Sequence, residues 1–140
     1  MASLEHWAKF KPDERLLREF DHWIVVARPK QITFGASVFL LKRPAPTLGS
    51  LNVDELAELA KVAQWFETTL TEKLGAEKFN YIAAMMKDPY FHFHAIPRYS
   101  QPVSVAGIEW PDEDWPAVAT FRDVDTSDAV LAEVIKLLRG

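Results

Sequence analysis

Two histidines two positions apart are the residues of this chain best suited to chemistry. His92 and His94 lie in the segment PYFHFHAIPRY, residues 89–99, which is rich in aromatic and apolar side chains. Successive side chains of a β-strand point to opposite faces, so both imidazoles and Tyr90 are expected on one face. Imidazole is costly to bury without hydrogen-bond partners, so this pair indicates a functional site. The alternative is a pair of core histidines, each with its own partner.

A metal site is one chemistry that such a pair can support, because His-x-His commonly holds a metal ion from a single strand. A zinc site needs at least one further ligand, and the chain has no cysteine. The other two histidines, His6 and His22, lie far upstream, which leaves Asp88 as the nearest candidate. The pattern of residues alone leaves this metal-binding alternative open.

The residues around the pair resemble a known motif. His92-Phe93-His94-Ala95-Ile96-Pro97-Arg98 is similar to the end of the histidine triad motif, His-φ-His-φ-His-φ-φ followed by Pro-Arg. In this register His94 matches the third histidine and His92 the middle one, while Tyr90 stands at the first position. Residues 78–84 resemble the preceding strand of bacterial members related to diadenosine tetraphosphate hydrolases, and residues 35–43 resemble the family's glycine-led strand. The resemblance covers roughly residues 20–100.

This resemblance implies a nucleotide hydrolase or transferase that cleaves a nucleoside 5′-phosphoryl bond of a purine compound. Neutral His92 would attack the α-phosphorus and form a nucleotidyl-imidazole intermediate that water resolves. His94 would stabilise the non-bridging oxygens, as imidazolium or as a hydrogen-bond donor. Asn80 and Tyr90 would position the phosphate or the leaving group. The resemblance requires neither a metal nor a cofactor.

The chain also departs from the family pattern. Close relatives carry Gly-Asn before the motif where this chain has Met85-Met86, and His or Gln where it has Tyr90. In the family these positions handle phosphate oxygens. One alternative is therefore a nucleotide-binding protein with little or no turnover, and the other is a metal-binding protein that uses His92 and His94.

The expected fold class is α+β, a single histidine-triad-like domain spanning residues 1–140 with an antiparallel sheet of about five strands. A long helix over about residues 53–74 is indicated by a capping-box-like start, Asn52-x-x-Glu55, and by Gly75 at its end. A C-terminal helix follows Thr126, and the apolar stripes of both helices are expected to pack on the sheet. Strands are predicted at residues 23–27, 32–41, 79–86 and 90–96. By the resemblance to the family, residues 23–26 and 34–39 of these strands would form an apolar slot for the base.

Composition limits the partners of the chain. Its 140 residues, 49% hydrophobic, suit one core, and its net charge of −4 gives no reason to expect nucleic acid binding. No run of apolar residues is long enough for a membrane helix, and residues 1–10 lack the features of a signal peptide, so the cytoplasm is expected. A homodimer is predicted because the last helix has a wide apolar stripe and Trp110 and Trp115 lie in an irregular segment.

Overall fold

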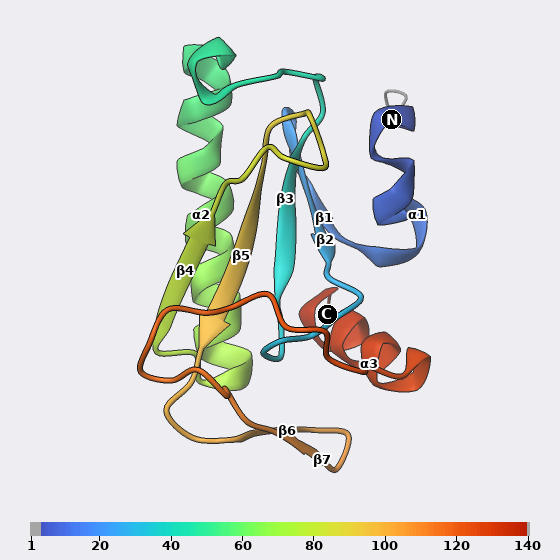
Figure 1. The fold of residues 1–140 in the computed structure, drawn as a ribbon, viewed down its shortest axis with the longest axis vertical. Coiled ribbons are helices and arrows are strands. Elements are labelled where there is room, and N and C mark those ends of the chain that lie inside the picture. The colour runs from blue at the N-terminus through green and yellow to red at the C-terminus, as the bar shows by residue number, and fades with distance from the viewer. Residues whose placement is uncertain (1–3, 140) are drawn as a thin grey trace.

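A five-stranded antiparallel sheet forms the centre of the computed structural model, which describes residues 4–139 (Figure 1). The strand order is β1 (Leu16–Glu19), β2 (Trp23–Ala27), β3 (Ser37–Leu41), β5 (His92–Arg98) and β4 (Lys78–Ile82). The long helix α2 (Val53–Leu74) covers one face, while the 3₁₀ helix η1 (Glu5–Phe10) and the short α1 (Pro12–Arg15) lie on the other side. The predicted α+β class and five-stranded sheet are confirmed.

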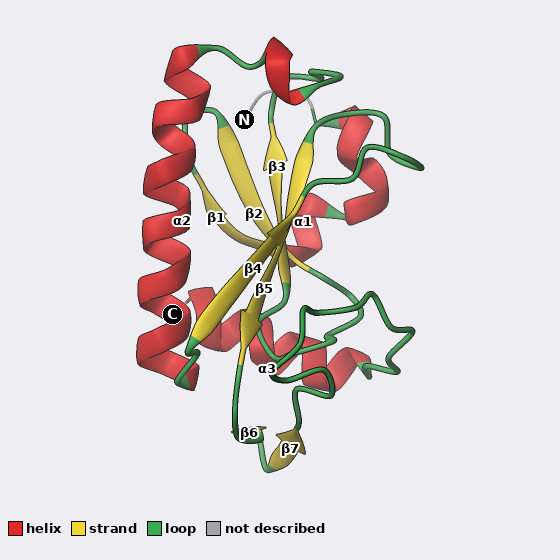
Figure 2. Ribbon diagram, turned by 60° about the vertical axis from the view of Figure 1, so that its left-hand side comes forward, coloured by secondary structure: helices red, strands yellow, loops and turns green. Residues whose placement is uncertain are grey.

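The remaining elements lie beyond the sheet. A 3₁₀ turn, η2 (Leu48–Ser50), precedes α2, and a small hairpin, β6 (Val103–Val105) and β7 (Ile108–Trp110), follows β5. The segment between β7 and the C-terminal helix α3 (Asp128–Arg139) has no helix or strand (Figure 2). None of the described helices combines the length and apolar character that crossing a membrane requires.

Helix α2 begins and ends where its sequence predicts. The Asn52 side chain accepts a hydrogen bond from the Glu55 amide at 2.8 Å, and the Asn52 amide donates to the Glu55 carboxylate at 2.9 Å. Gly75 ends the helix in the left-handed region, with φ of 74°. The buried face of α2, formed by Val62, Phe66 and Leu70, packs on the sheet.

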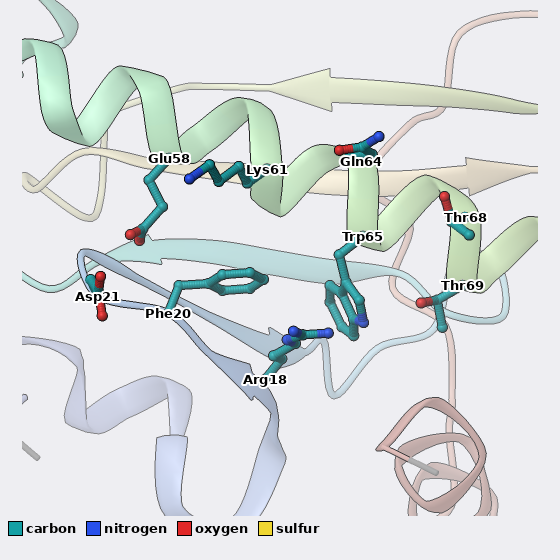
Figure 3. A pocket seen from close by; sticks show the side chains of 9 residues that line it. All are labelled: Arg18, Phe20, Asp21, Glu58, Lys61, Gln64, Trp65, Thr68 and Thr69. Carbon is teal, nitrogen blue, oxygen red and sulfur yellow. The ribbon is translucent and has the colours of Figure 1, made fainter.

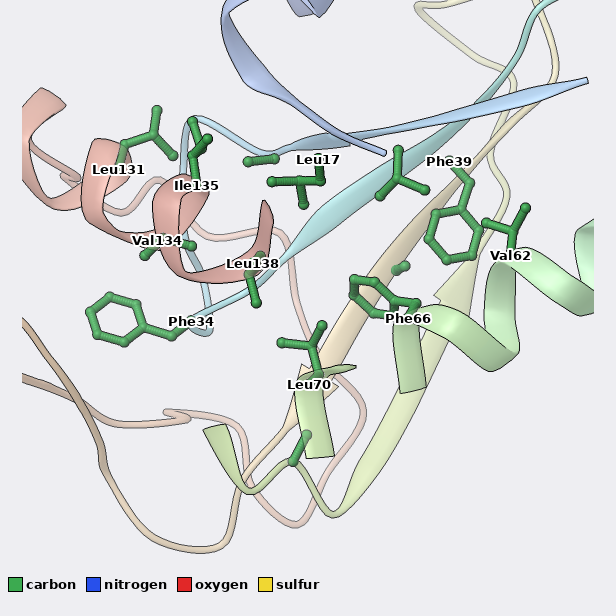
Figure 4. Close-up of a cluster of buried hydrophobic side chains, with 14 of the residues drawn as sticks. Leu17, Phe34, Phe39, Val62, Phe66, Leu70, Leu131, Val134, Ile135 and Leu138 are labelled. Atoms are coloured by element: carbon green, nitrogen blue, oxygen red, sulfur yellow. The ribbon is translucent and has the colours of Figure 1, made fainter. Parts of the chain in front are cut away.

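The main core lies between the sheet and its two longer helices (Figure 4). Phe39 of β3 meets the ring of Phe66 edge-on at 5.3 Å. From α3, the predicted apolar stripe is buried inside the same chain and contributes Val130, Leu131, Val134, Ile135 and Leu138. This stripe is therefore not available as the dimer surface that the sequence suggested. Trp110 is likewise used internally, because it stacks on Phe34 and donates its indole N–H to the Gln31 carbonyl.

Two predicted strands are shorter than expected. The strand predicted over residues 32–41 begins at Ser37, because the chain turns at Gly35, whose φ is 94° and where an added Cβ would lie 2.3 Å from Leu70. The strand predicted over residues 79–86 ends at Ile82. Beyond it the chain leaves the ladder, and the Phe91 amide donates to the Ala45 carbonyl instead.

The predicted strand at residues 90–96 is shifted and runs from His92 to Arg98. In its pairing with β4, Ile82 lies opposite His94 and Asn80 opposite Ile96. The predicted three-residue connection at 87–89 is wrong, because both strands stop short of it. The histidine pair nevertheless lies within regular, central sheet structure.

Candidate functional site

The two histidines lie side by side on β5, facing away from α2. His92 pairs with Leu40 of β3 and His94 with Val38, and the centroids of the two imidazole rings are 5.1 Å apart. The alternation predicted from sequence therefore places both on one face. His92 is only 1% exposed, whereas His94 is partly buried.

One hydrogen bond fixes the tautomer of His92. Its Nδ1 lies 2.8 Å from the backbone carbonyl oxygen of Tyr90. A carbonyl oxygen only accepts hydrogen bonds, so Nδ1 must carry the proton and donate it. The lone pair of Nε2 is then free in the neutral ring, which is the form that a nucleophile at phosphorus requires.

The N-terminal segment covers this face of the sheet. The rings of Trp7 and Phe10 lie 5.6 and 6.0 Å from the His92 ring, centroid to centroid. The indole of Trp7 is 1% exposed and donates to the Leu41 carbonyl at 2.7 Å. Trp7 and Leu4 pack on Ile24, Val26, Val38 and Leu40, so they cover this face of the strands that were predicted to hold a base. Any ligand that reaches His92 must therefore share this space with Trp7.

Arg28 and Phe121 border His94, and sequence reasoning identified neither. The His94 and Phe121 rings are 4.7 Å apart, and the Arg28 guanidinium lies 4.9 Å from the centre of the same Phe121 ring. Burial, and next the positive charge of Arg28, lower the pKa of His94 from 6.5 to about 4. His94 is therefore neutral near pH 7 and acts there as a hydrogen-bonding group.

We expect this histidine to make stability fall in acid. The unfolded chain takes up a proton at His94 near pH 6.5, whereas the folded chain does so only near pH 4, so stability is lost as the pH falls through that range. Glutamine does not titrate. As the pH falls from 7 to 4.5, the melting temperature of the wild type should therefore decrease more than that of His94→Gln. A difference between the two proteins that stays constant with pH would contradict the assignment.

The structure does not bring Asn80 to the histidine pair. Its side-chain oxygen accepts hydrogen bonds from Arg98 Nη1 at 2.7 Å and from the Ala119 amide at 3.0 Å. Arg98 is buried and makes two hydrogen bonds to the Asp112 carboxylate, at 2.7 and 3.0 Å. Asn80 thus belongs to a network that holds the segment after β7 against the sheet. Its predicted contact with substrate stays a prediction.

Tyr90 lies next to the histidine pair and contacts the N-terminal segment. Besides the carbonyl that holds His92, its ring makes edge contacts with His6 at 5.4 Å and Trp7 at 6.2 Å. His6, which sequence reasoning left aside as distant, therefore reaches the neighbourhood of the site. Only the return of η1 across the sheet brings it there, and no local pattern signals such a return.

Three buried nitrogen atoms remain without a hydrogen-bond partner among the described residues: His6 Nε2, Arg28 Nη1 and His94 Nδ1. All three side chains border the histidine face through the ring contacts given above. Within residues 4–139, no three histidine, cysteine or acidic side chains come together as a set that could hold a metal ion.

An open pocket lies elsewhere on the molecule. It has a volume of about 550 Å³ and opens between β1 and α2, where the Arg18 guanidinium lies over the rings of Phe20 and Trp65 (Figure 3). None of the predicted site residues lines it.

Known structures resemble this chain in fold. The C. elegans NitFhit protein superposes with a TM-score of 0.64 at 22% identity, covering 90% of this chain but only 27% of that protein. A hypothetical histidine triad nucleotide-binding protein from Sulfolobus tokodaii gives 0.69 at 13% identity, covering 94% of this chain and 89% of its own. A zinc-bound histidine triad family protein from Mycobacterium smegmatis gives 0.65 at 17%, covering 97% and 93%.

No protein-family model matches the sequence, and no curated protein matches it either. The relationship therefore rests on the arrangement of the elements. The chain has the α+β fold of the histidine triad proteins.

Proposed function

We propose that this protein is a nucleotide hydrolase or transferase of the histidine triad type, acting on a purine nucleoside 5′-phosphoryl bond. The observation that carries the proposal is the bond from His92 Nδ1 to the Tyr90 carbonyl, because in the neutral ring it makes Nε2 the nitrogen with the free lone pair, beside a second imidazole. The likeness to histidine triad structures and the sequence motif support the same reaction class.

The reaction would proceed in two displacements. His92 Nε2 attacks the α-phosphorus, a P–N bond forms, and the bond from phosphorus to the leaving group breaks as that group takes up a proton. Water then attacks phosphorus, the P–N bond breaks, and neutral His92 returns. His94, neutral near pH 7, stabilises the non-bridging oxygens through a hydrogen bond rather than a charge.

A panel of adenosine and guanosine 5′-derivatives tests this proposal. It should contain phosphoramidates, sulfates, sugar diphosphates and dinucleoside polyphosphates, each followed by the release of the nucleoside monophosphate. Turnover of one class above the background rate supports the proposal. The absence of turnover across the panel favours the nucleotide-binding alternative, which the burial of His92 beneath Trp7 and Phe10 also favours.

The metal-binding alternative has less support from the site. One nitrogen of His92 is already bonded to Tyr90, and the described residues offer no third ligand. The zinc-bound Mycobacterium smegmatis structure is the reason to measure metal content directly. Elemental analysis of protein before and after chelation decides this point.

We expect the Met85-Met86 pair to slow the cleavage of dinucleoside polyphosphates. Met85 packs partly against the core and Met86 is 86% exposed, and a thioether donates no hydrogen bond. The loss of one well-aimed donor costs about a hundred- to a thousandfold in rate. Met85→Gly/Met86→Asn, with and without Tyr90→Gln, should therefore raise turnover of diadenosine tetraphosphate. Rapid cleavage by the unmodified protein, or no change in the variants, would refute this expectation.

We also propose a homodimer, through the β4 edge instead of α3. β4 is the last strand of the sheet, and an apolar groove beside it is lined by Phe39, Leu59, Ala63, Tyr81 and Phe93. A second copy would cover this groove and the exposed Leu56 and Met86. Light scattering should give twice the chain mass of 16.0 kDa.

Variants at this edge test where the dimer forms. Tyr81→Lys should shift the protein toward a monomer, because it places a charge in the groove. Val118→Lys, at a 70% exposed position on the segment before α3, should leave the dimer intact. A monomeric wild-type protein at micromolar concentration would overturn the proposal.

A further inference from the structure

Arg28 is a partly buried cation that has no acidic partner among the described residues. Its side chain makes no ion pair or hydrogen bond in residues 4–139, and Nη1 is buried without a partner. Burial lowers the pKa of this guanidinium below its ordinary value, yet arginine stays protonated in proteins. A charge that is desolvated and unpaired destabilises the folded chain, so its presence calls for a ligand.

The sheet register directs Arg28 to the histidine face. Its amide donates to the Ala36 carbonyl at 2.9 Å, which continues the β2–β3 ladder one step beyond the pair of Ala27 and Ser37. Alternation then puts Arg28 on the same face as Val26, which lies in one row with Val38 and His94 across β3 and β5. The guanidinium thus belongs to the face that carries His92 and His94.

Two side chains with an unsatisfied nitrogen contact the same aromatic ring. Arg28 Nη1 and His94 Nδ1 both lack partners, and both side chains lie against Phe121. Leaving a buried polar group without a hydrogen-bond partner destabilises the folded chain. A ligand with negatively charged oxygens would satisfy both groups at once, and a guanidinium matches a phosphoryl group through two parallel hydrogen bonds.

We propose that Arg28 is the anion-binding residue of this site, and that its guanidinium and the His94 imidazole together receive the oxygens of a phosphoryl ligand. The inference rests on the proposed function for the class of the ligand and adds the residue that recognises its charge. Arg28 supplies the fixed positive charge at this site, since His94 is neutral near pH 7.

Phe121 borders the space that the anion would enter. Its side chain is 48% exposed and lies in the segment without helix or strand, so a change of its rotamer would break neither a ladder nor a helix. The flanking residues stay anchored, because Arg122 pairs with Asp114 and Asp123 with Lys30.

Calorimetric titration with inorganic pyrophosphate and with adenosine separates charge recognition from base recognition. Arg28→Gln should weaken pyrophosphate binding about ten- to a hundredfold, the value of hydrogen bonds to a charged group, and leave adenosine binding unchanged. Arg18→Gln is the matched control, because it removes the same charge from the pocket beside α2 and should alter neither affinity. Arg28→Lys keeps the charge without the planar fork and should bind pyrophosphate several-fold more weakly than the wild type.

Thermal unfolding separates this role from a structural one. If Arg28 serves a ligand, Arg28→Met removes an unpaired desolvated charge and should raise the melting temperature of the ligand-free protein. If Arg28 mainly holds Phe121 in place, the same change should lower it, and that result would overturn the proposal. A wild-type protein that does not bind pyrophosphate, or an Arg28→Gln or Arg28→Lys protein that binds it as tightly as the wild type, would overturn it too.

The proposed reaction and this inference fail separately. Pyrophosphate binding that is lost in Arg28→Gln, without turnover of any nucleotide, leaves the anion site standing and removes the hydrolase. Turnover with pyrophosphate affinity unchanged in Arg28→Gln removes the anion site alone.

Discussion

His92→Ala should abolish turnover while the fold and the affinity for nucleotide persist. Removal of a covalent nucleophile costs on the order of a millionfold in rate, because the residual reaction lacks its intermediate. The ring is almost fully buried beneath Trp7 and belongs to none of the ion pairs among the described residues, so alanine leaves a cavity rather than an unpaired charge. Circular dichroism, nucleotide titration and the release of nucleoside monophosphate measure the three properties.

His22→Ala is the matched control for this experiment. His22 precedes β2, and its amide donates to Glu58 at 2.6 Å, a contact that alanine preserves. We expect its turnover to equal that of the wild type. An active His92→Ala protein would show that the register read from Pro97-Arg98 assigns the wrong nucleophile.

The second large effect is on stability. Arg98→Met should lower the free energy of unfolding by about 3–5 kcal/mol, because it leaves the buried Asp112 carboxylate without its counter-ion. The two side chains are 3% and 2% exposed, and Asp112 also accepts a hydrogen bond from the Tyr99 amide at 3.1 Å. Urea unfolding followed by tryptophan fluorescence measures the change.

A matched ion pair on the surface serves as the control. Arg122 also pairs with an aspartate, Asp114, but its side chain is 44% exposed, so Arg122→Met should cost about 1 kcal/mol or less. Arg98→Met/Asp112→Leu should recover part of the lost stability, since it removes both buried charges. Equal losses in Arg98→Met and Arg122→Met would contradict the role given to the buried pair.

Local signals in the sequence were sufficient for the scaffold. Asn52, Glu55 and Gly75 mark the ends of α2 because capping depends on the residues themselves. The alternation around His92 predicts that both imidazoles lie on one face, because successive side chains of a strand point to opposite sides. The strand ends were less predictable, because tertiary contacts such as the one from Phe91 to Ala45 decide where pairing stops.

The surroundings of the histidines could not be read from local patterns. Trp7 and Phe121 come from opposite ends of the chain and reach β5 only through the packing of η1 and of the segment before α3. Arg98 looked like part of a motif, yet its partners Asp112 and Asn80 lie 14 and 18 residues away. One feature of the sequence could have identified Arg28: it is a charged residue that directly follows an apolar strand, in step with the side chains of the histidine face.

The central claim is that His92 Nε2 forms a covalent bond to phosphorus. Rapid acid quenching of the wild-type protein with an adenosine 5′-phosphoryl substrate that it turns over, followed by peptide mass spectrometry, tests it directly. We predict a peptide of residues around 92 that carries one adenylyl group on His92, and its absence in His92→Ala. An adenylyl group on His94, or turnover with no adduct under conditions that preserve P–N bonds, would contradict the account.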